Sequence, residues 1–393
     1  MAELLSVEEA LQAVLARVEP LETERVRLAD ASGRVLAEAA RAAVDLPPFP
    51  SSAMDGFALR SADTPGRLPV VDRVAAGRPA SRPLAAGEAM GIATGGVVPD
   101  GADAVVPIER VEAIEDSVEV SEHVPEGANV RPRGGDVESG SLVVEAGTRI
   151  GPAQIGALAA AGVGAVECPR RPRVAVLTTG TELRQPGEQL GAGEIYESNG
   201  AMLRALLGEA GAEVELLDPV EDTEEAHRSS IERGLGHDVL VTSGGVSVGP
   251  HDLVRRIEGE LGVEEVFWGV SVRPGKPLAF GVSGRTLVFG LPGNPVSSLV
   301  SSVLFVLPAL RALQGEHDPE PRYRRAALAA PVTPDSRRDE LVRARLTAEG
   351  ELEPLSGQES HMIASAAAAN ALVYVPTGPE QLPRGSTVRY LAI

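Results

Sequence analysis

Apolar and polar positions follow two different patterns along the chain. In residues 6–18 the apolar side chains recur at helical spacing, and Ser6 with Glu9 gives the capping box that starts a helix. From about 43 to 136 the pattern changes to short apolar runs broken by glycine and proline, which predicts a β-rich insertion. Short runs return at 318–393 and predict a small β-barrel or sandwich. Two more helices are predicted, at about 29–41 and 152–161.

The strongest signal lies between residues 171 and 317. Residues 173–177 form a continuous apolar run, as in a strand that is buried on both faces. Helical and strand-like segments then alternate, which predicts a mostly parallel sheet with helices on both faces. The expected helices are about 198–210, 223–234, 251–261 and 296–313, and the other expected strands are 214–217, 239–241 and 286–289.

These changes of pattern divide the chain into four predicted domains. The expected fold class is multidomain α/β, with a central three-layer α/β domain, a β-rich insertion domain, a helical N-terminal domain and a small C-terminal β-barrel. The N-terminal domain is expected to be discontinuous, because the helix near 152–161 should pack beside the first helices. The boundaries are 1–42 with 137–170, then 43–136, 171–317 and 318–393.

Composition and charge narrow the classes of function. The net charge of −20 argues against nucleic acid or an anionic membrane as a partner, so an anionic substrate would need a local positive pocket. The single cysteine, Cys168, can form neither an internal disulfide nor a cysteine-based zinc site. The N-terminus has no signal-peptide core, and no stretch of 18 apolar residues is expected to span a bilayer. A cytoplasmic protein is therefore predicted.

Lys276 is the one lysine in a chain with 35 arginines. Arginine does not replace lysine where a compact, strongly hydrated charge is needed. Lys276 stands in the sequence Arg273-Pro274-Gly275-Lys276-Pro277, and these neighbours favour a functional role over a chance surface position.

Three glycine-rich turns follow the expected strands of the α/β domain. The carboxyl ends of parallel strands meet at one edge of a sheet, where ligands bind. Glycine lets the backbone approach a ligand closely, and hydroxyl and N–H groups bind phosphate oxygens. Asn294 and Pro295 are typical of a helix start, whose dipole would point at the same crevice. The predicted ligand-binding residues here are Thr179, Gly180, Ser243, Gly244, Gly245, Ser247, Pro292, Gly293, Asn294 and Pro295.

Carboxylates surround the same edge. Glu182 and Asp252 lie in or directly after the turns, whereas Asp218 and Asp222 fit a site or a solvated surface equally well. Several carboxylates beside bound phosphate suit Mg²⁺, a cation that prefers oxygen ligands. Three polar segments outside this domain are further candidates, although each could be an ordinary turn: 50–58, 94–103 and 129–136.

Taken together, these motifs resemble the molybdopterin molybdenumtransferase family, which includes the C-terminal enzymatic domain of gephyrin. The resemblance covers essentially the whole chain. It implies an elongated homodimer in which each active site lies between the α/β domain of one subunit and the first two domains of the other. The segments that carry it are 52–56, 101–106, 180–183, 243–249, 274–277, 291–297 and 360–362.

The resemblance also implies a reaction. Adenylylated molybdopterin and molybdate react in the presence of Mg²⁺ to give molybdenum cofactor and AMP, with transient contacts to the adenylyltransferase and to molybdoenzymes. Family carboxylates fall on Asp55, Glu182, Asp222 and Asp252, the last three as metal ligands. Lys276 is placed with these catalytic residues, and it joins Arg343 and Ser360 in oxyanion contacts, with Arg273 among the substrate-binding residues. The chain departs from the family pattern at Thr181, Gly96, Pro250, Gly269 and Arg273.

Two other functions are compatible with parts of the pattern. A molybdopterin adenylyltransferase would resemble the 171–317 domain alone, and the additional domains argue against it. A non-enzymatic scaffold would need partner-binding linkers, and no long linker separates the predicted domains.

Overall fold

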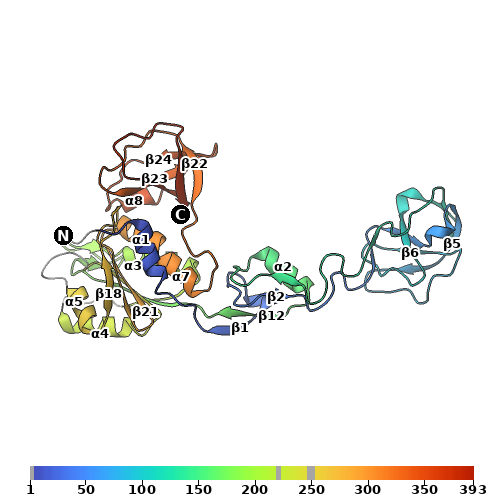
Figure 1. Cartoon of the computed structure of the whole chain (residues 1–393), viewed down its shortest axis with the longest axis horizontal. Coiled ribbons are helices and arrows are strands. Elements are labelled where there is room, and N and C mark those ends of the chain that lie inside the picture. Colours follow the sequence, from blue (N-terminus) through green and yellow to red (C-terminus); the bar gives the residue numbers. More distant parts are fainter. Residues whose placement is uncertain (1–3, 218–222, 246–252) are drawn as a thin grey trace. The chain divides into compact units, whose positions relative to one another are not determined.

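The computed structural model describes residues 4–217, 223–245 and 253–393, which form two compact units (Figure 1). The first unit comprises Met1–Glu24, Gly33–Ala37 and Cys168–Ile393, and the second comprises Arg25–Ser32 and Glu38–Glu167. The bounds of the four domains stay a prediction, but the expected N-terminal domain takes residues from both units. The helix at 7–15 contributes to the core of the α/β segment and does not share a unit with the predicted helix near 152–161.

The first helix begins where the capping box predicts. Helix α1 spans Val7–Leu15, with Ser6 Oγ accepting from the Glu9 N–H at 3.1 Å and Glu9 Oε2 accepting from the Ser6 N–H at 2.8 Å. Its apolar face is buried at Val7, Ala10, Leu11 and Val14.

The prediction of a helix at 29–41 is wrong, because the structure has no α-helix there. One 3₁₀ turn, η1 (Leu28–Asp30), is followed by irregular chain up to the short strand β2 (Ala40–Arg41). Gly33 has φ +75°, which is incompatible with a continuous helix. The buried Arg34 side chain donates hydrogen bonds to the Glu24 carboxylate at 2.6 Å and to the Pro169 carbonyl at 2.7 Å. Tertiary contacts therefore override the local helical pattern.

A six-stranded sheet forms the centre of the first unit. Its order is β16-β13-β17-β21-β20-β18, and the first four strands are parallel, as the alternating pattern predicts. Strands β20 and β18 extend the sheet through antiparallel pairing. The sequence pattern did not predict these two strands, because their segment has no clear alternation of apolar and polar residues. The bounds are β13 Arg173–Thr178, β16 Glu213–Leu216, β17 Val239–Ser243, β18 Glu264–Trp268, β20 Ala279–Ser283 and β21 Thr286–Leu291.

Helices cover both faces of this sheet (Figure 1). Val174 and Val176 of β13 contribute to a core that includes α1 and α3, whereas Ala175 and Leu177 contribute to a second core with α4 and α5. This alternation confirms a three-layer α/β arrangement. The helices are α3 Asn199–Glu209, α4 Glu224–Gly234, α5 Leu253–Glu260, α6 Pro295–Ser301 and α7 Leu307–Leu313.

Helices α6 and α7 are joined by a π-helical turn at Ser302–Val306, so that residues 295–313 form one continuous helix. By length and composition this helix could cross a bilayer, which corrects the expectation that no such stretch exists. However, 78% of the most apolar 18-residue stretch of this helix is buried inside the protein, as in the core helix of an α/β domain.

The C-terminal strands close into a five-stranded barrel, because β23 pairs with both β24 and β25. This confirms the predicted barrel. Strand β19 (Val272–Arg273) joins from the α/β segment by pairing with β23. The barrel strands are β22 Arg324–Leu328, β23 Asp339–Leu346, β24 Glu351–Pro354, β25 Ala371–Val375 and β26 Thr387–Ala392, and the short helix α8 spans Ile363–Ala366.

The second unit is rich in short strands, as predicted. Its main sheet has the order β7-β4-β6-β5-β9-β8, and the predicted helix near 152–161 is α2 (Pro152–Ala160). The main strands are β4 Gly56–Leu59, β5 Gly66–Val74, β6 Ala89–Ile92, β7 Ala104–Pro107, β8 Glu112–Ile114 and β9 Ser117–Val120. Its shorter elements are η2 Ser61–Asp63, η3 Ile108–Arg110, β3 Ser51–Ser52, β10 Val130–Arg131 and β11 Leu142–Val144. Strand β1 (Thr23–Arg27) pairs with β12 (Ala165–Pro169), and the pair β14 (Leu183–Arg184) and β15 (Ile195–Tyr196) belongs to the first unit.

Replacing Asp238 with asparagine is expected to lower the free energy of unfolding of the first unit by about 2 kcal/mol. Asp238 accepts two hydrogen bonds from Arg170, each 2.6 Å long, and one from the Arg173 N–H at 2.8 Å. Burial raises the pKa of Asp238, but these bonds outweigh burial, so the pKa lies below its ordinary 3.8. The stabilisation is therefore complete above pH 3.8 and is lost as the pH falls through the lower pKa of the folded state.

Chemical unfolding of wild type and Asp238→Asn between pH 2 and 7 measures this difference. The control is Glu19→Gln, because Glu19 pairs with Arg285 at an exposed position where an ion pair contributes little. Equal stability of Asp238→Asn and wild type at pH 7 would show that the Arg170 pair is not stabilising.

Candidate functional site

The three glycine-rich turns meet at the carboxyl edge of the parallel strands, as predicted. The Thr179 N–H donates to the Ser243 carbonyl at 3.1 Å, which joins the turns after β13 and β17. The Gly244 N–H donates to the Leu291 carbonyl at 3.1 Å, which joins the turns after β17 and β21. The structure therefore brings Thr179, Gly180, Ser243, Gly244, Gly245, Pro292 and Gly293 together.

Glycine is required at the centre of this edge. Gly244 has φ +95°, and a Cβ atom there would lie 2.8 Å from the Thr179 carbonyl oxygen. At Gly245, with φ +68°, a Cβ would lie 2.7 Å from Val254 Cγ2. Side chains at these positions would have to displace backbone or core atoms, so the close approach of the turns depends on glycine.

Ser243 lies beneath the turns and not on their surface. Its side chain is buried, and its Oγ accepts from Asn199 Nδ2 at 2.8 Å and lies 3.3 Å from Ser298 Oγ. The Asn199 amide also donates to the Gly293 carbonyl at 2.8 Å. Ser243 thus supports the neighbouring turn, and its direct contact with a ligand stays a prediction.

The sequence interpretation missed two buried polar residues at this edge, Glu197 and Asn199. Glu197 Oε1 accepts from the Gly200 N–H at 2.7 Å and so caps the start of α3. Asn199 is the first residue of that helix and links two of the turns. The signal was present, because an acidic residue and an asparagine directly before a helical run are typical of a helix start.

The carboxylates of the edge are described only in part. Glu182 is exposed, and its Oε2 lies 2.7 Å from where a Cβ of Gly180 would be, so the carboxylate covers the Gly180 turn. Asp218, Asp222, Asp252 and Ser247 lie outside the described residues. Within residues 4–217, 223–245 and 253–393, no group of three or more acidic, histidine or cysteine side chains could hold a metal ion.

Lys276 lies on a loop that packs against α6 near Ser301, the last residue of that helix. Gly275 has φ +120°, and a Cβ there would lie 2.9 Å from Ser301 Oγ, so glycine allows this close packing. The Lys276 carbonyl accepts from the Val270 N–H at 3.0 Å, whereas its side chain is exposed and has no ion pair within the described parts of the chain. The ammonium group is thus available for a ligand.

Arg273 is placed differently from Lys276. Its guanidinium lies 3.5 Å from Asp335 and 3.7 Å from Glu340 of the barrel. Burial raises the pKa of Glu340, against the opposing effect of the Arg273 charge. Arg273 therefore links the β19 loop to the barrel. Its direct contact with substrate stays a prediction, in which the guanidinium would bind substrate and these two carboxylates at the same time.

Ser360 of the barrel lies at the start of α6. Asn294, which occupies the N-cap position, donates through Nδ2 to Ser360 Oγ at 2.9 Å, and the Val296 N–H donates to the Ser360 carbonyl at 3.1 Å. Pro295 occupies the first helical turn, as predicted. The barrel therefore brings Ser360 to the glycine-rich edge.

Arg343 is 1% exposed and holds the loop that carries Ser360. Its guanidinium donates to the carbonyls of Gly357, Glu359 and Met362 at 2.6, 3.1 and 2.8 Å. Burial lowers its pKa below the ordinary value, and Glu359 opposes this effect. A direct contact between Arg343 and an oxyanion stays a prediction that would require some of these bonds to be replaced.

In the second unit, three of the candidate turns come together around Asp55. Asp55 Oδ1 accepts from the Thr94 N–H at 2.8 Å, and the Ala53 N–H donates to the Asn129 carbonyl at 2.9 Å. Ser52 is buried and its backbone bonds Gly95 and Gly96. The turns near 52–56, 94–96 and 129–131 thus form one cluster with an exposed carboxylate.

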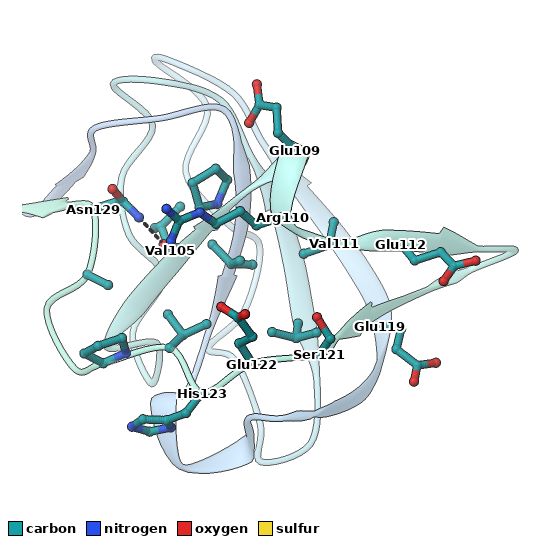
Figure 2. A pocket seen from close by; sticks show the side chains of 16 residues that line it. Val105, Glu109, Arg110, Val111, Glu112, Glu119, Ser121, Glu122, His123 and Asn129 are labelled. Carbon is teal, nitrogen blue, oxygen red and sulfur yellow. Dashed lines mark hydrogen bonds between the residues drawn. The ribbon is translucent and has the colours of Figure 1, made fainter.

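The second unit also contains a groove of about 690 Å³ between β7 and the segment 109–125 (Figure 2). Four glutamates, Glu109, Glu112, Glu119 and Glu122, line it with a single arginine, Arg110. This excess of negative charge is unfavourable for a phosphate or molybdate ligand. The groove is therefore not the predicted anion site.

The glycine-rich edge of the parallel sheet defines an α/β ligand-binding domain, to which the chain adds a β-rich unit with an exposed Asp55 cluster and a C-terminal barrel. Three family models match: the MoeA N-terminal region (domain I and II) at residues 5–162, a probable molybdopterin binding domain at 175–312, and the MoeA C-terminal region (domain IV) at 325–393. The chain belongs to the MoeA family.

Individual relatives agree with this assignment. The chain is 35% identical to molybdopterin molybdenumtransferase 2 of Mycobacterium tuberculosis over 400 residues, covering 98% of each protein. It is 36% identical to the molybdopterin molybdenumtransferase of Haemophilus influenzae over 318 residues, covering 80% of this chain and 78% of the relative. A molybdopterin biosynthesis MoeA protein structure from Pyrococcus horikoshii aligns over all of both chains, with a TM-score of 0.87 and 29% identity.

Proposed function

We propose that this enzyme transfers molybdenum from molybdate to adenylylated molybdopterin, with cleavage of the adenylate, to give molybdenum cofactor and AMP. The observation that carries the proposal is the convergence of the three glycine-rich turns with Ser360 around the start of α6, while the loop of Lys276 packs against the same helix through Gly275. Backbone N–H groups and a lysine suit phosphate and molybdate oxygens. They supply local positive charge in a protein whose net charge is −20. The enzyme is proposed to act in the cytoplasm.

Mg²⁺ is part of the proposal. Glu182 fits one ligand position, because its carboxylate is exposed above the Gly180 turn, and Asp222 and Asp252 are proposed to complete the set. When bound, Mg²⁺ would neutralise charge on the diphosphate of the substrate. Lys276 would orient molybdate, and the backbone turns would hold the phosphates.

We further propose a homodimer in which each active site takes the sheet edge from one subunit and Asp55 from the other. Asp55→Ala is then expected to fold normally and to lose AMP release by about 10²-fold, because an exposed carboxylate that orients a reacting group contributes on this scale. Asp55→Asn keeps an acceptor for the Thr94 N–H but loses the charge, so it separates loop bonding from electrostatics. AMP release with molybdate, Mg²⁺ and adenylylated molybdopterin is the measurement.

Complementation tests the shared site. Co-expression of Asp55→Ala and Lys276→Ala chains gives mixed dimers with one intact site of two, so that a random mixture should recover about a quarter of wild-type activity. If both residues of a site came from the same subunit, the mixture would stay inactive. ATP consumption with pterin, without release of AMP from the adenylate, would instead indicate an adenylyltransferase.

A further inference from the structure

A buried polar network lies beneath the Pro292-Gly293-Asn294 turn. Ser298 Oγ donates to the Pro292 carbonyl, and Asn199 Nδ2 donates to the Gly293 carbonyl at 2.8 Å. Ser243 Oγ links the two donors, because it accepts from Asn199 and lies 3.3 Å from Ser298 Oγ. Ser298 and Ser243 are 0% and 3% exposed, and Asn199 is 9% exposed.

The geometry of the peptide bond turns this network into a constraint on two N–H groups. In a trans peptide the carbonyl and the following N–H point in opposite directions. The Pro292 and Gly293 carbonyls are held inward, so the N–H groups of Gly293 and Asn294 point away from Ser298 and Asn199. Gly293 and Asn294 are exposed, and neither N–H has a hydrogen-bond acceptor within the described chain.

We propose that Asn199 is a positioning residue, which holds the Gly293 carbonyl inward so that the outward N–H groups of Gly293 and Asn294 bind a phosphate oxygen of the substrate. Two adjacent N–H groups with fixed direction are a recurring way to bind phosphate. Asn199 suits the role because its two amide hydrogens are both used, one on the Ser243 hydroxyl and one on the Gly293 carbonyl. This inference rests on the function proposed above and adds the atoms that would contact phosphate.

The adenylylated substrate has two phosphates, one from the pterin and one from AMP, and both have the chemistry that these N–H groups bind. Titration calorimetry with AMP and, separately, with molybdopterin distinguishes them. Asn199→Asp keeps the shape of the side chain but removes both donors. The phosphate that lies on the turn should bind about tenfold more weakly, as expected for the loss of one or two hydrogen bonds, while the other is unaffected.

Two further variants keep the test decisive if Asn199→Asp is unstable. Ser298→Ala removes the donor to the neighbouring Pro292 carbonyl and should weaken the same phosphate. Thr242→Val is the control: Thr242 precedes Ser243 on β17, is 0% exposed, and its Oγ1 has no partner among the described residues, so phosphate binding should not change. Steady-state kinetics should show a higher KM with kcat changed less.

The outcomes separate the inference from the function on which it rests. Unchanged affinity for both AMP and molybdopterin in folded Asn199→Asp and Ser298→Ala would overturn the positioning role, and so would an equal loss in Thr242→Val. If wild type releases no AMP from adenylylated molybdopterin, yet phosphate affinity depends on Asn199, the positioning role stands and the proposed reaction is wrong.

Discussion

Replacing Lys276 with alanine should reduce molybdate-dependent AMP release by about 10²- to 10³-fold, the range seen when one preorganised donor to a developing charge is removed. The fold should be unchanged, because the ammonium group is exposed and the loop is held by the Lys276 carbonyl and by the packing of Gly275 against Ser301. Single-turnover release of AMP, with thermal unfolding in parallel, measures both effects.

Two controls make this result specific. Lys276→Arg keeps the charge but replaces a compact ammonium group with a planar fork, so activity should lie between wild type and alanine. Arg285→Ala removes an exposed positive charge from the turn between β20 and β21, next to Glu19 and Glu22, and should leave AMP release unchanged. Wild-type turnover by folded Lys276→Ala would remove Lys276 from the site.

The second large effect is expected for Gly244→Ala, which should abolish most of the activity. The new Cβ would lie 2.8 Å from the Thr179 carbonyl oxygen and 2.9 Å from Thr179 Oγ1, in a backbone conformation with φ +95°. The turns after β13 and β17 would have to separate, and a displacement near 1 Å in a positioning element costs about 10²-fold in rate.

Gly262→Ala is the matched control for Gly244→Ala. Gly262 has a similar φ, +88°, in the turn between α5 and β18, but a Cβ there meets no atom within 4 Å. The Gly262→Ala variant should be about 1 kcal/mol less stable because of backbone strain, and its activity should be unchanged. Equal activity losses in both variants would attribute the effect to strain, whereas full activity of Gly244→Ala would show that the close approach of the turns is dispensable.

The sequence predicted the α/β sheet well because its strands are local patterns with buried faces. The 173–177 run and the helix starting at Asn294-Pro295 were placed within a residue or two of β13 and α6. The prediction of a helix at 29–41 was wrong because the conformation there depends on distant parts of the chain. Arg34 is held by Glu24 and by the carbonyl of Pro169, which lies 135 residues further along the chain. The antiparallel strands β18 and β20 were missed because their pairing depends on partners and not on their own period.

Within the proposed site, the sequence by itself determined which residues are candidates for the chemistry: the glycines that permit close turns, the lone lysine and the carboxylates predicted around the sheet edge. These follow from backbone freedom and side-chain charge, which are properties of the residues themselves. The tertiary structure alone decided which contacts each residue makes. It placed Ser243 beneath the turn, buried Arg343 against the loop of Ser360, paired Arg273 with barrel carboxylates, and joined Asn199 to Gly293. These roles depend on hydrogen bonds between segments distant in the chain, and no local pattern encodes which donor meets which carbonyl.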